Sequence, residues 1–275
     1  MDEVRPVGVF LSSLAIPDPT EAIAKAAELG IHYVHIPRLP EQWLTPEGLD
    51  KIKAALEKHS VKVSAGCAVY PGEDYSNMET VRNTVGLLPA QYAEERLEIT
   101  KQCADFTREL GAPILTTHVG VIPRDTTCED YKRLVRIVQQ VADDCAEKGL
   151  TFAMETGQET AEEMVVFLEH VARENVKINF DPANMILYGT GRPLPALDTL
   201  KEFVVHVHVK DGLWPAAEGE LGTEVPLGQG EVGIPAYINK LKEIGYTYVL
   251  TIEREAGEDR IGDIARAKQL LDSLR

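Results

Sequence analysis

Basic residues are scarce in this sequence, and their scarcity excludes one large class of partners. Among 275 residues, 28 are Lys or Arg and 44 are Asp or Glu, so the formal net charge is −16 with His neutral. Proteins that bind nucleic acid need clustered Lys and Arg to neutralise phosphates. Because no basic run interrupts the acidic background, the sequence predicts a protein that does not bind nucleic acid.

Cysteine and long apolar runs are also in short supply. The cysteines at positions 67, 103, 128 and 145 form no Cys-x-x-Cys pair, which favours reduced, buried thiols over disulfides. No stretch approaches the roughly 18–20 unbroken apolar residues of a membrane-spanning helix. Residues 1–6 lack the charged-then-apolar pattern of an export signal. We therefore expect a cytoplasmic protein without membrane association.

What is present is a regular alternation of short apolar and longer amphipathic segments, in a chain that is 44% hydrophobic and therefore globular. The expected strands cover residues 7–11, 32–36, 61–69, 114–119, 151–155, 176–181, 204–210 and 248–253. The expected helices cover residues 19–29, 46–59, 91–110, 128–148, 161–174, 194–201, 235–244 and 259–274.

Local signals agree with this segmentation. A glycine ends a helix immediately before a strand at positions 30, 111, 149 and 245. Thr160 with Glu163 matches a capping box, and Thr45-Pro46 places proline at a first helical position. Eight strand–helix units predict one (β/α)8 TIM barrel domain over residues 1–275. An open doubly wound sheet is the alternative, but no Gly-x-Gly-x-x-Gly or Walker-type turn supports it.

Two connections are longer than the usual two to six residues of such loops. They cover residues 70–90 and 211–232, after the third and seventh strands. Both leave from the carboxyl ends of strands, which is the face where barrel active sites are built. We therefore expect these loops to cover a site.

The seventh strand carries polar residues on one face. Side chains alternate in direction along a strand, so Val205, Val207 and Val209 are expected to pack on the outer helices. His206, His208 and Lys210 are then expected to point into the barrel. Three buried polar groups in one column need a hydrogen-bond network or an ion.

The same alternation directs a carboxylate inward at the end of three further strands. These residues are Glu155, Asp181 and Glu253. Carboxylates that share one mouth repel each other unless a cation compensates them. With His208 they form an oxygen-rich ligand set that suits Mn²⁺, Mg²⁺, Co²⁺ or Zn²⁺. The alternative is a metal-free ion-pair network with Lys210 and Arg254.

These strand ends resemble those of the xylose-isomerase-like TIM barrels, or sugar phosphate isomerase/epimerase family. That family includes ketose 3-epimerases, inosose dehydratase and an apurinic endonuclease branch. The matching segments are Met154-Glu155-Thr156, Phe180-Asp181-Pro182-Ala183-Asn184, His206 to Gly212, Gly228-Gln229-Gly230-Glu231 and Ile252-Glu253. The resemblance covers nearly the whole chain and is specific for the family rather than for one reaction.

The resemblance implies a metal ligand set and a mechanism. One divalent ion, with Mn²⁺ favoured, would be bound by Glu155, Asp181, His208 and Glu253. The ion would hold a sugar's carbonyl and adjacent hydroxyl, while Glu155 and Glu253 move a proton through an enediolate. The residues fit that chemistry, since a cation stabilises a developing oxyanion and carboxylates act as base and acid.

The sequence departs from ketose 3-epimerases at two substrate contacts. Those enzymes have His where this chain has Asn184, and Arg where it has Trp214. The Lys-Asp-Gly after His208 and the Gly-Gln-Gly-Glu segment are more similar to inosose dehydratase. The predicted substrate-binding residues are His118, Asn184, His206, Lys210, His35, Arg38 and Trp214. For His206, support of the ligand His208 is an additional interpretation.

We therefore predict a metal-dependent sugar or sugar phosphate isomerase or epimerase. The alternative is a metal-dependent dehydratase of an inosose-like polyol ketone, which would use the same ion and base. A phosphodiesterase acting on damaged DNA would need additional His ligands and a basic surface. A non-catalytic sugar-binding or metal-binding barrel stays open as well. We expect the partner to be a small sugar or polyol, and the chain to form a homodimer.

Overall fold

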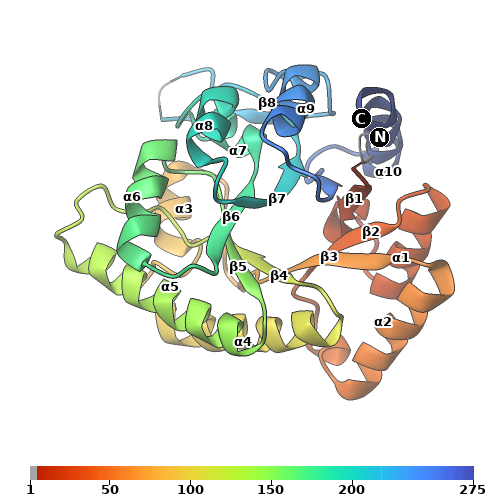
Figure 1. Cartoon of the computed structure of the whole chain (residues 1–275), viewed down its shortest axis with the longest axis horizontal. Helices are drawn as coiled ribbons and strands as arrows, with labels where there is room; N and C mark the ends of the chain where they lie inside the picture. The colour runs from red at the N-terminus through yellow and green to blue at the C-terminus, as the bar shows by residue number, and fades with distance from the viewer. Residues whose placement is uncertain (1–4, 218) are drawn as a thin grey trace.

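The computed structural model describes residues 5–217 and 219–275, and within them eight parallel strands close into a barrel (Figure 1). Around the barrel the order is β1-β10-β7-β6-β5-β4-β3-β2. The strands are β1 (Val7–Phe10), β2 (Tyr33–Pro37), β3 (Lys62–Cys67), β4 (Ile114–Thr117), β5 (Thr151–Glu155), β6 (Val176–Phe180), β7 (Val204–Val209) and β10 (Leu250–Ile252). The predicted (β/α)8 TIM barrel is confirmed. Its organisation as a single domain over residues 1–275 stays a prediction.

Helices surround the strands (Figure 1). The helices are α1 (Pro19–Glu28), α2 (Pro46–His59), α3 (Met78–Thr84), α4 (Ala93–Glu109), α5 (Glu129–Glu147), α6 (Ala161–Val171), α7 (Pro182–Leu187), α8 (Pro193–Leu200), α9 (Ile234–Glu243) and α10 (Arg260–Leu274). Short 3₁₀ turns cover Leu11–Leu14 and Glu41–Trp43. The guanidinium of Arg275 donates to the backbone oxygen of Arg5 at 2.8 Å, which joins the two ends. None of the helices in the described ranges has the length and apolar character of a bilayer span.

The local signals act as the sequence predicts. Thr160 and Glu163 form the reciprocal capping box at the start of α6, and Thr45 caps α2 at Gly48. The four helix-ending glycines all have φ between 71° and 75°. A side chain would strain this left-handed backbone, so glycine at these positions fixes where helix gives way to strand.

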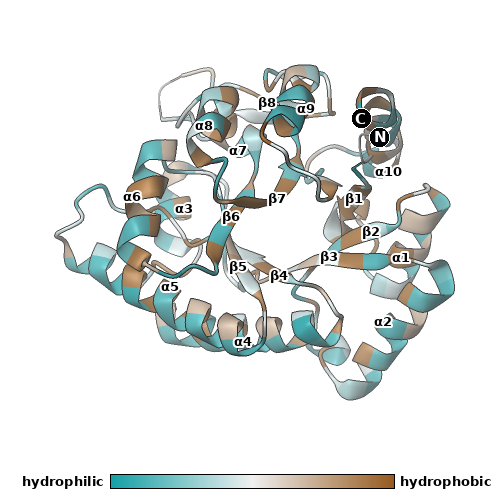
Figure 2. Cartoon of the chain, in the orientation of Figure 1, coloured by the Kyte–Doolittle hydropathy of each residue, from teal (hydrophilic) through white to brown (hydrophobic). Residues whose placement is uncertain are grey.

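The core lies between the barrel and the helices, whose apolar faces turn toward the strands (Figure 2). Phe152, Met154, Val207 and Val209 are fully buried in it, on the outward faces that the alternation predicts. The prediction for Val205 is wrong. Its side chain packs against the small inner cluster of Ala65, Ile114 and Ala153. The register between β6 and β7 shifts just before His206, so strict alternation fails there.

The two long connections contain structure of their own. Helix α3 lies within residues 70–90, and strands β8 (Asp211–Leu213) and β9 (Thr223–Val225) form an antiparallel hairpin within residues 211–232. Helix α7, which follows β6 directly, is absent from the sequence prediction, and β10 is shorter than predicted. In both places the segment is too short to carry a clear periodicity.

Candidate metal centre and active-site cavity

Four predicted ligands meet at the carboxyl ends of the strands. Glu155 ends β5, Asp181 follows β6, His208 lies in β7 and Glu253 follows β10. One donor atom from each lies within 4.8 Å of the others, and all four residues are buried. Nδ1 of His208 lies 3.2 Å from Oε1 of Glu155, 3.1 Å from Oε2 of Glu253 and 3.7 Å from Oδ2 of Asp181. The predicted set is therefore brought together.

Two buried atoms of this cluster that could bind a metal ion have no hydrogen-bond partner among the described residues. They are Oδ2 of Asp181 and Nδ1 of His208. The other oxygen of Asp181 caps α7, where it accepts from the backbone amides of Ala183 and Asn184. Buried polar atoms without partners are costly, and an ion would satisfy both. Two ligands at about 2.1 Å from an ion lie about 3 Å apart when they are at right angles, so the spacing fits a divalent cation.

The charges around His208 also show what a cation would replace. Burial alone lowers the pKa of His208, but the carboxylates of Glu253 and Glu155 outweigh this and hold it well above its ordinary value. Burial would raise the pKa of both glutamates, yet His208, with His118 beside Glu155 and Lys210 beside Glu253, keeps each pKa below its ordinary value. Without metal, a protonated His208 therefore balances the carboxylates, and a divalent ion would take over that role.

A fully buried polar layer supports the ligands from below. His206 has its Nδ1 atom 2.8 Å from Oδ1 of Asn179, and Asn179 donates to Oε2 of Glu155 at 3.2 Å. Oγ of Ser64 and Oγ1 of Thr251 lie 3.3 and 3.2 Å from the other ring nitrogen of His206. This layer positions the carboxylate of Glu155. A substrate contact for His206, which is fully buried, stays a prediction.

Above the ligands lies a cavity of about 430 Å³, within the range of small-molecule sites. Three predicted substrate residues line it. Asn184 donates to Oε1 of Glu155 at 3.1 Å, and Nε2 of His118 lies 3.5 Å from the same oxygen. Lys210 donates to Glu253 at 3.1 Å and to Glu255 at 2.5 Å. The cavity therefore places a cation and an amide beside the two predicted catalytic glutamates.

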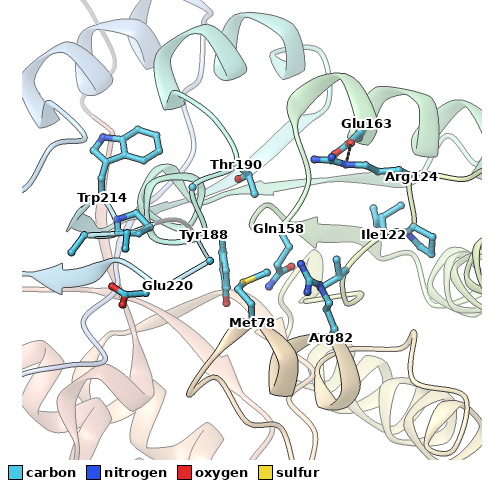
Figure 3. A pocket seen from close by; sticks show the side chains of 17 residues that line it. Met78, Arg82, Ile122, Arg124, Gln158, Glu163, Tyr188, Thr190, Trp214 and Glu220 are labelled. Atoms are coloured by element: carbon cyan, nitrogen blue, oxygen red, sulfur yellow. Dashed lines mark ion pairs between the residues drawn. The ribbon is translucent and has the colours of Figure 1, made fainter.

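The remaining predicted substrate residues lie elsewhere. His35 is fully buried beneath His208. Arg38 lies in an apolar groove beside Leu39 and pairs with Glu41 at 2.5 Å. Trp214 lines a second groove of about 910 Å³ (Figure 3). The ring of Tyr188 forms a wall of both this groove and the metal-side cavity. Substrate roles for His35, Arg38 and Trp214 stay predictions.

Both long connections contribute to the cavity, as their length predicts. Glu73 and Tyr75 come from residues 70–90, while Gly222 and Glu224 come from the hairpin connection. Glu224 accepts from Arg254 at 2.6 Å, and Arg254 also donates to Asp263 at 2.9 Å. Arg254 is thus engaged away from the four ligands. Glu224 could not be predicted from the sequence, because nothing local marks a loop residue that turns back to a strand end.

Asp211 explains why Lys-Asp-Gly and Gly-Gln-Gly-Glu occur together. Its carboxylate accepts four backbone amides, from Gly212 and Val232 at one oxygen and from Gly228 and Gly230 at the other, over 2.9–3.1 Å. A Cβ at Gly230 would lie 2.2 Å from Oδ1 of Asp211. The two motifs are therefore hydrogen-bonded to each other, and these bonds hold together the two ends of the connection over residues 211–232.

The chain has two uncharacterized curated relatives. One, from Methanocaldococcus jannaschii, is 24% identical over 206 residues, which are 67% of this chain and 65% of the relative. The other, from Escherichia coli, is 32% identical over 101 residues, which are 36% of this chain and 31% of the relative. The chain thus matches less than two thirds of the length of either.

Solved structures match over nearly the full length. A xylose isomerase domain protein from Planctomyces limnophilus is 35% identical, with 100% of this chain and 98% of that chain covered and a TM-score of 0.91. D-psicose 3-epimerase from Clostridium cellulolyticum is 15% identical, with 98% and 99% covered and a TM-score of 0.73. A probable 3-DHS dehydratase from Bacillus anthracis is 17% identical, with 97% and 98% covered and a TM-score of 0.74. The last two similarities show the fold alone.

The family description that matches is "Xylose isomerase-like TIM barrel", over residues 23–275. That span includes all four ligand positions and all eight barrel strands except β1. The chain therefore belongs to the xylose isomerase-like TIM barrel family.

Proposed function

We propose that this protein is a divalent-metal-dependent isomerase or epimerase of a sugar or sugar phosphate, which transfers a proton beside a carbonyl. One observation carries the proposal. The carboxylates of Glu155 and Glu253 lie 3.2 and 3.1 Å from the same ring nitrogen of His208, and both line one cavity. Two carboxylates at one substrate position can act as base and acid for a proton transfer.

Glu155, Asp181, His208 and Glu253 would hold the ion. When bound, it supplies a positive charge that stabilises the oxyanion developing on the substrate. One glutamate takes the proton from the carbon beside the carbonyl, which leaves an enediolate. The other glutamate, which has taken up a proton from solvent, returns it to the opposite face of that carbon, or to the former carbonyl carbon while the hydroxyl proton moves between the two oxygens. The first outcome is epimerisation and the second is isomerisation.

Different side chains hold the two glutamates in place. Asn184 donates to Oε1 of Glu155 and orients it, and His118 approaches the same oxygen. Lys210 donates to Glu253 and helps to keep its pKa low. A carboxylate held ionised is suited to accept a proton. Because the pKa of each glutamate is lowered, either can take the first proton, and the configuration of the substrate carbon selects which one does.

Loss of water from an inosose-like polyol ketone is the second candidate, and Lys210 favours it. Its ammonium group lines the cavity beside Glu253. Glu253 would take the proton beside the carbonyl, the bond from the next carbon to its hydroxyl would break, and Lys210 would protonate the departing hydroxide to water. A dehydratase also shares this fold at a TM-score of 0.74.

Three finer points belong to the same proposal. We propose Mn²⁺ as the native ion, because three carboxylates and one imidazole suit a hard-to-intermediate cation. We propose a cytoplasmic location, which the four free cysteines support. We also propose a homodimer. Metal content of protein purified without added metal, together with light scattering on a sizing column, tests the first and last of these.

Deuterium uptake from D₂O tests the reaction. The Mn²⁺-loaded protein would meet a panel of free and phosphorylated ketoses and inososes, followed by mass spectrometry and NMR. We expect deuterium at the carbon beside the carbonyl, with the substrate's oxygens retained. Loss of water would replace the isomerase with the dehydratase. Absence of both across the panel, with metal bound, would contradict the proposed substrate class.

A further inference from the structure

A chain of hydrogen bonds runs from the inner wall of the barrel to the ligand His208. Nε2 of His35 lies 3.3 Å from the backbone oxygen of Gly66 and 3.0 Å from Oγ1 of Thr116. Nδ1 of His35 lies 3.0 Å from Nε2 of His208. Both imidazoles are fully buried. The chain therefore ends on the ring nitrogen of His208 that faces away from the carboxylates.

The backbone oxygen of Gly66, where this series of hydrogen bonds begins, indicates which ring nitrogens carry hydrogen. A backbone carbonyl oxygen can only accept, so a hydrogen on Nε2 of His35 serves both Gly66 and the hydroxyl oxygen of Thr116, whereas a bare Nε2 would set its lone pair against the carbonyl. Among the described residues, no carboxylate contacts His35 to balance a charge, so the buried ring is neutral and its Nδ1 is an acceptor. Nε2 of His208 must then donate to it. The hydrogen of His208 is thus directed toward His35, and Nδ1 is left to face the carboxylates.

Asn179 also approaches Nε2 of His208. Its Nδ2 lies 3.3 Å from Nε2 of His208, which would suit an acceptor at that nitrogen. However, the same amide nitrogen donates to Oε2 of Glu155 at 3.2 Å, and its oxygen lies 2.8 Å from a ring nitrogen of His206. These two contacts fix the amide's orientation, and Glu155 takes one of the two hydrogens on Nδ2. The shorter contact, at 3.0 Å, is the one to His35.

We infer that His35 is a positioning residue that holds His208 in the Nε2–H tautomer, so that the lone pair of Nδ1 is available to a divalent cation. The usual partner for the second nitrogen of a metal-binding histidine is a carboxylate or a carbonyl. Here a neutral imidazole takes that place and passes the hydrogen bond on to Gly66. A carboxylate there would add a fourth buried negative charge beneath three others, which the imidazole avoids.

The inference rests on the metal-ligand assignment but not on the proposed sugar chemistry. Metal affinity measured without substrate tests the role of His35 separately from the proposed function, because this affinity does not depend on which reaction the protein catalyses. Isothermal titration with Mn²⁺ would compare wild type with two nearly isosteric variants, His35→Asn and His35→Leu. Asn keeps an acceptor near the position of Nδ1, and Leu removes it, while both lose the ring and its packing against Phe10.

We expect His35→Leu to bind Mn²⁺ about 10- to 100-fold more weakly than wild type, as for other supports of metal ligands, and His35→Asn to stay within roughly threefold. Thermal unfolding of the metal-free variants should give similar midpoints, because both leave a similar space in the barrel. Equal Mn²⁺ affinity in the two variants would show a merely structural role and overturn the inference.

A second measurement needs no variant. Long-range ¹H–¹⁵N correlation spectra of the Mg²⁺-loaded wild type report which ring nitrogen of each histidine carries hydrogen. We expect Nε2–H at both His35 and His208. A hydrogen on Nδ1 of His35 would reverse the direction of the chain and overturn the inference, even where His35→Leu fails to fold.

Discussion

One oxygen, Oε2 of Glu253, lies 3.1 Å from Nζ of Lys210 and 3.1 Å from Nδ1 of His208. All three residues are buried. The same oxygen therefore contacts the ammonium group of Lys210 and belongs to the proposed metal-binding group. This arrangement keeps Glu253 ionised in a place where burial alone would protonate it.

Replacing Lys210 with Met should move the acid limb of the pH–rate profile upward. Loss of the ammonium group removes a cation that lowers the pKa of Glu253, so the carboxylate needs a higher pH to ionise. We expect a shift of about one pH unit or more, read from deuterium exchange between pH 5 and 8. Lys240→Met, which removes a lysine paired with Asp198, is the matched control. An unshifted acid limb in the Lys210 variant would contradict the role given to this residue.

His208→Ala should abolish tight metal binding. Loss of a residue that only supports a metal ligand weakens affinity by about 10- to 100-fold, and loss of the ligand itself should cost more. Elemental analysis after dialysis measures bound metal per chain, with His32→Ala, at an exposed position, as the control. A full complement of metal in the His208 variant would show that the ligand assignment is wrong.

Glu155→Gln and Glu253→Gln should each lower substrate deuterium exchange by about 10²- to 10⁴-fold at saturating metal. Gln keeps the shape of the side chain but cannot accept the substrate proton. Glu162→Gln, on the exposed face of α6, should keep wild-type exchange. Wild-type turnover in both cavity variants would remove the two-carboxylate mechanism altogether.

Glu159→Gln should change how stability depends on pH. Burial raises the pKa of Glu159 to about 7, above the ordinary value of about 4.3 expected in the unfolded chain. A raised folded pKa gives stability that is complete below the unfolded pKa and lost as pH rises through about 7. The variant does not titrate, so it should exceed wild type by roughly 3–4 kcal/mol at pH 8.

Urea unfolding in the presence of chelator, from pH 5 to pH 8, measures this difference. Chelation keeps metal binding out of the comparison. The backbone amide of Gly157, which donates to Glu159 at 3.2 Å, can donate to Gln as well, so the hydrogen bond is retained. If the difference in free energy of unfolding between variant and wild type stays constant with pH, the pKa of Glu159 is not raised.

Asp211→Ala should release the hairpin connection. Four backbone amides lose their acceptor, and the two that are buried, of Gly212 and Val232, each cost about 1–3 kcal/mol when left without a partner. We expect faster proteolysis between residues 212 and 232 and a lower melting temperature than for Asp198→Ala, at an exposed position. Equal cleavage rates in the two variants would show that the connection is held by other contacts.

The sequence by itself determined the barrel and the grouping of its four candidate metal ligands. The strand–helix alternation requires parallel strands, and parallel strands in a closed barrel bring their carboxyl ends to one face. Glu155, Asp181, His208 and Glu253 each lie at such an end with inward parity, so chain position alone placed them together. Asn179 has the same parity and could have been found by that rule.

Only the tertiary structure decided which further residues surround the four candidate ligands. The shifted register before His206 turned Val205 inward, because a bulge breaks the period of two on which the alternation depends. The contact between His35 and His208 spans 173 positions and follows from strand order and stagger. Loop residues such as Glu224 reach the cavity only because the hairpin connection folds back over it. Long-range contacts of this kind depend on the path of the backbone through the fold. No periodicity or residue spacing in the local sequence indicates that path.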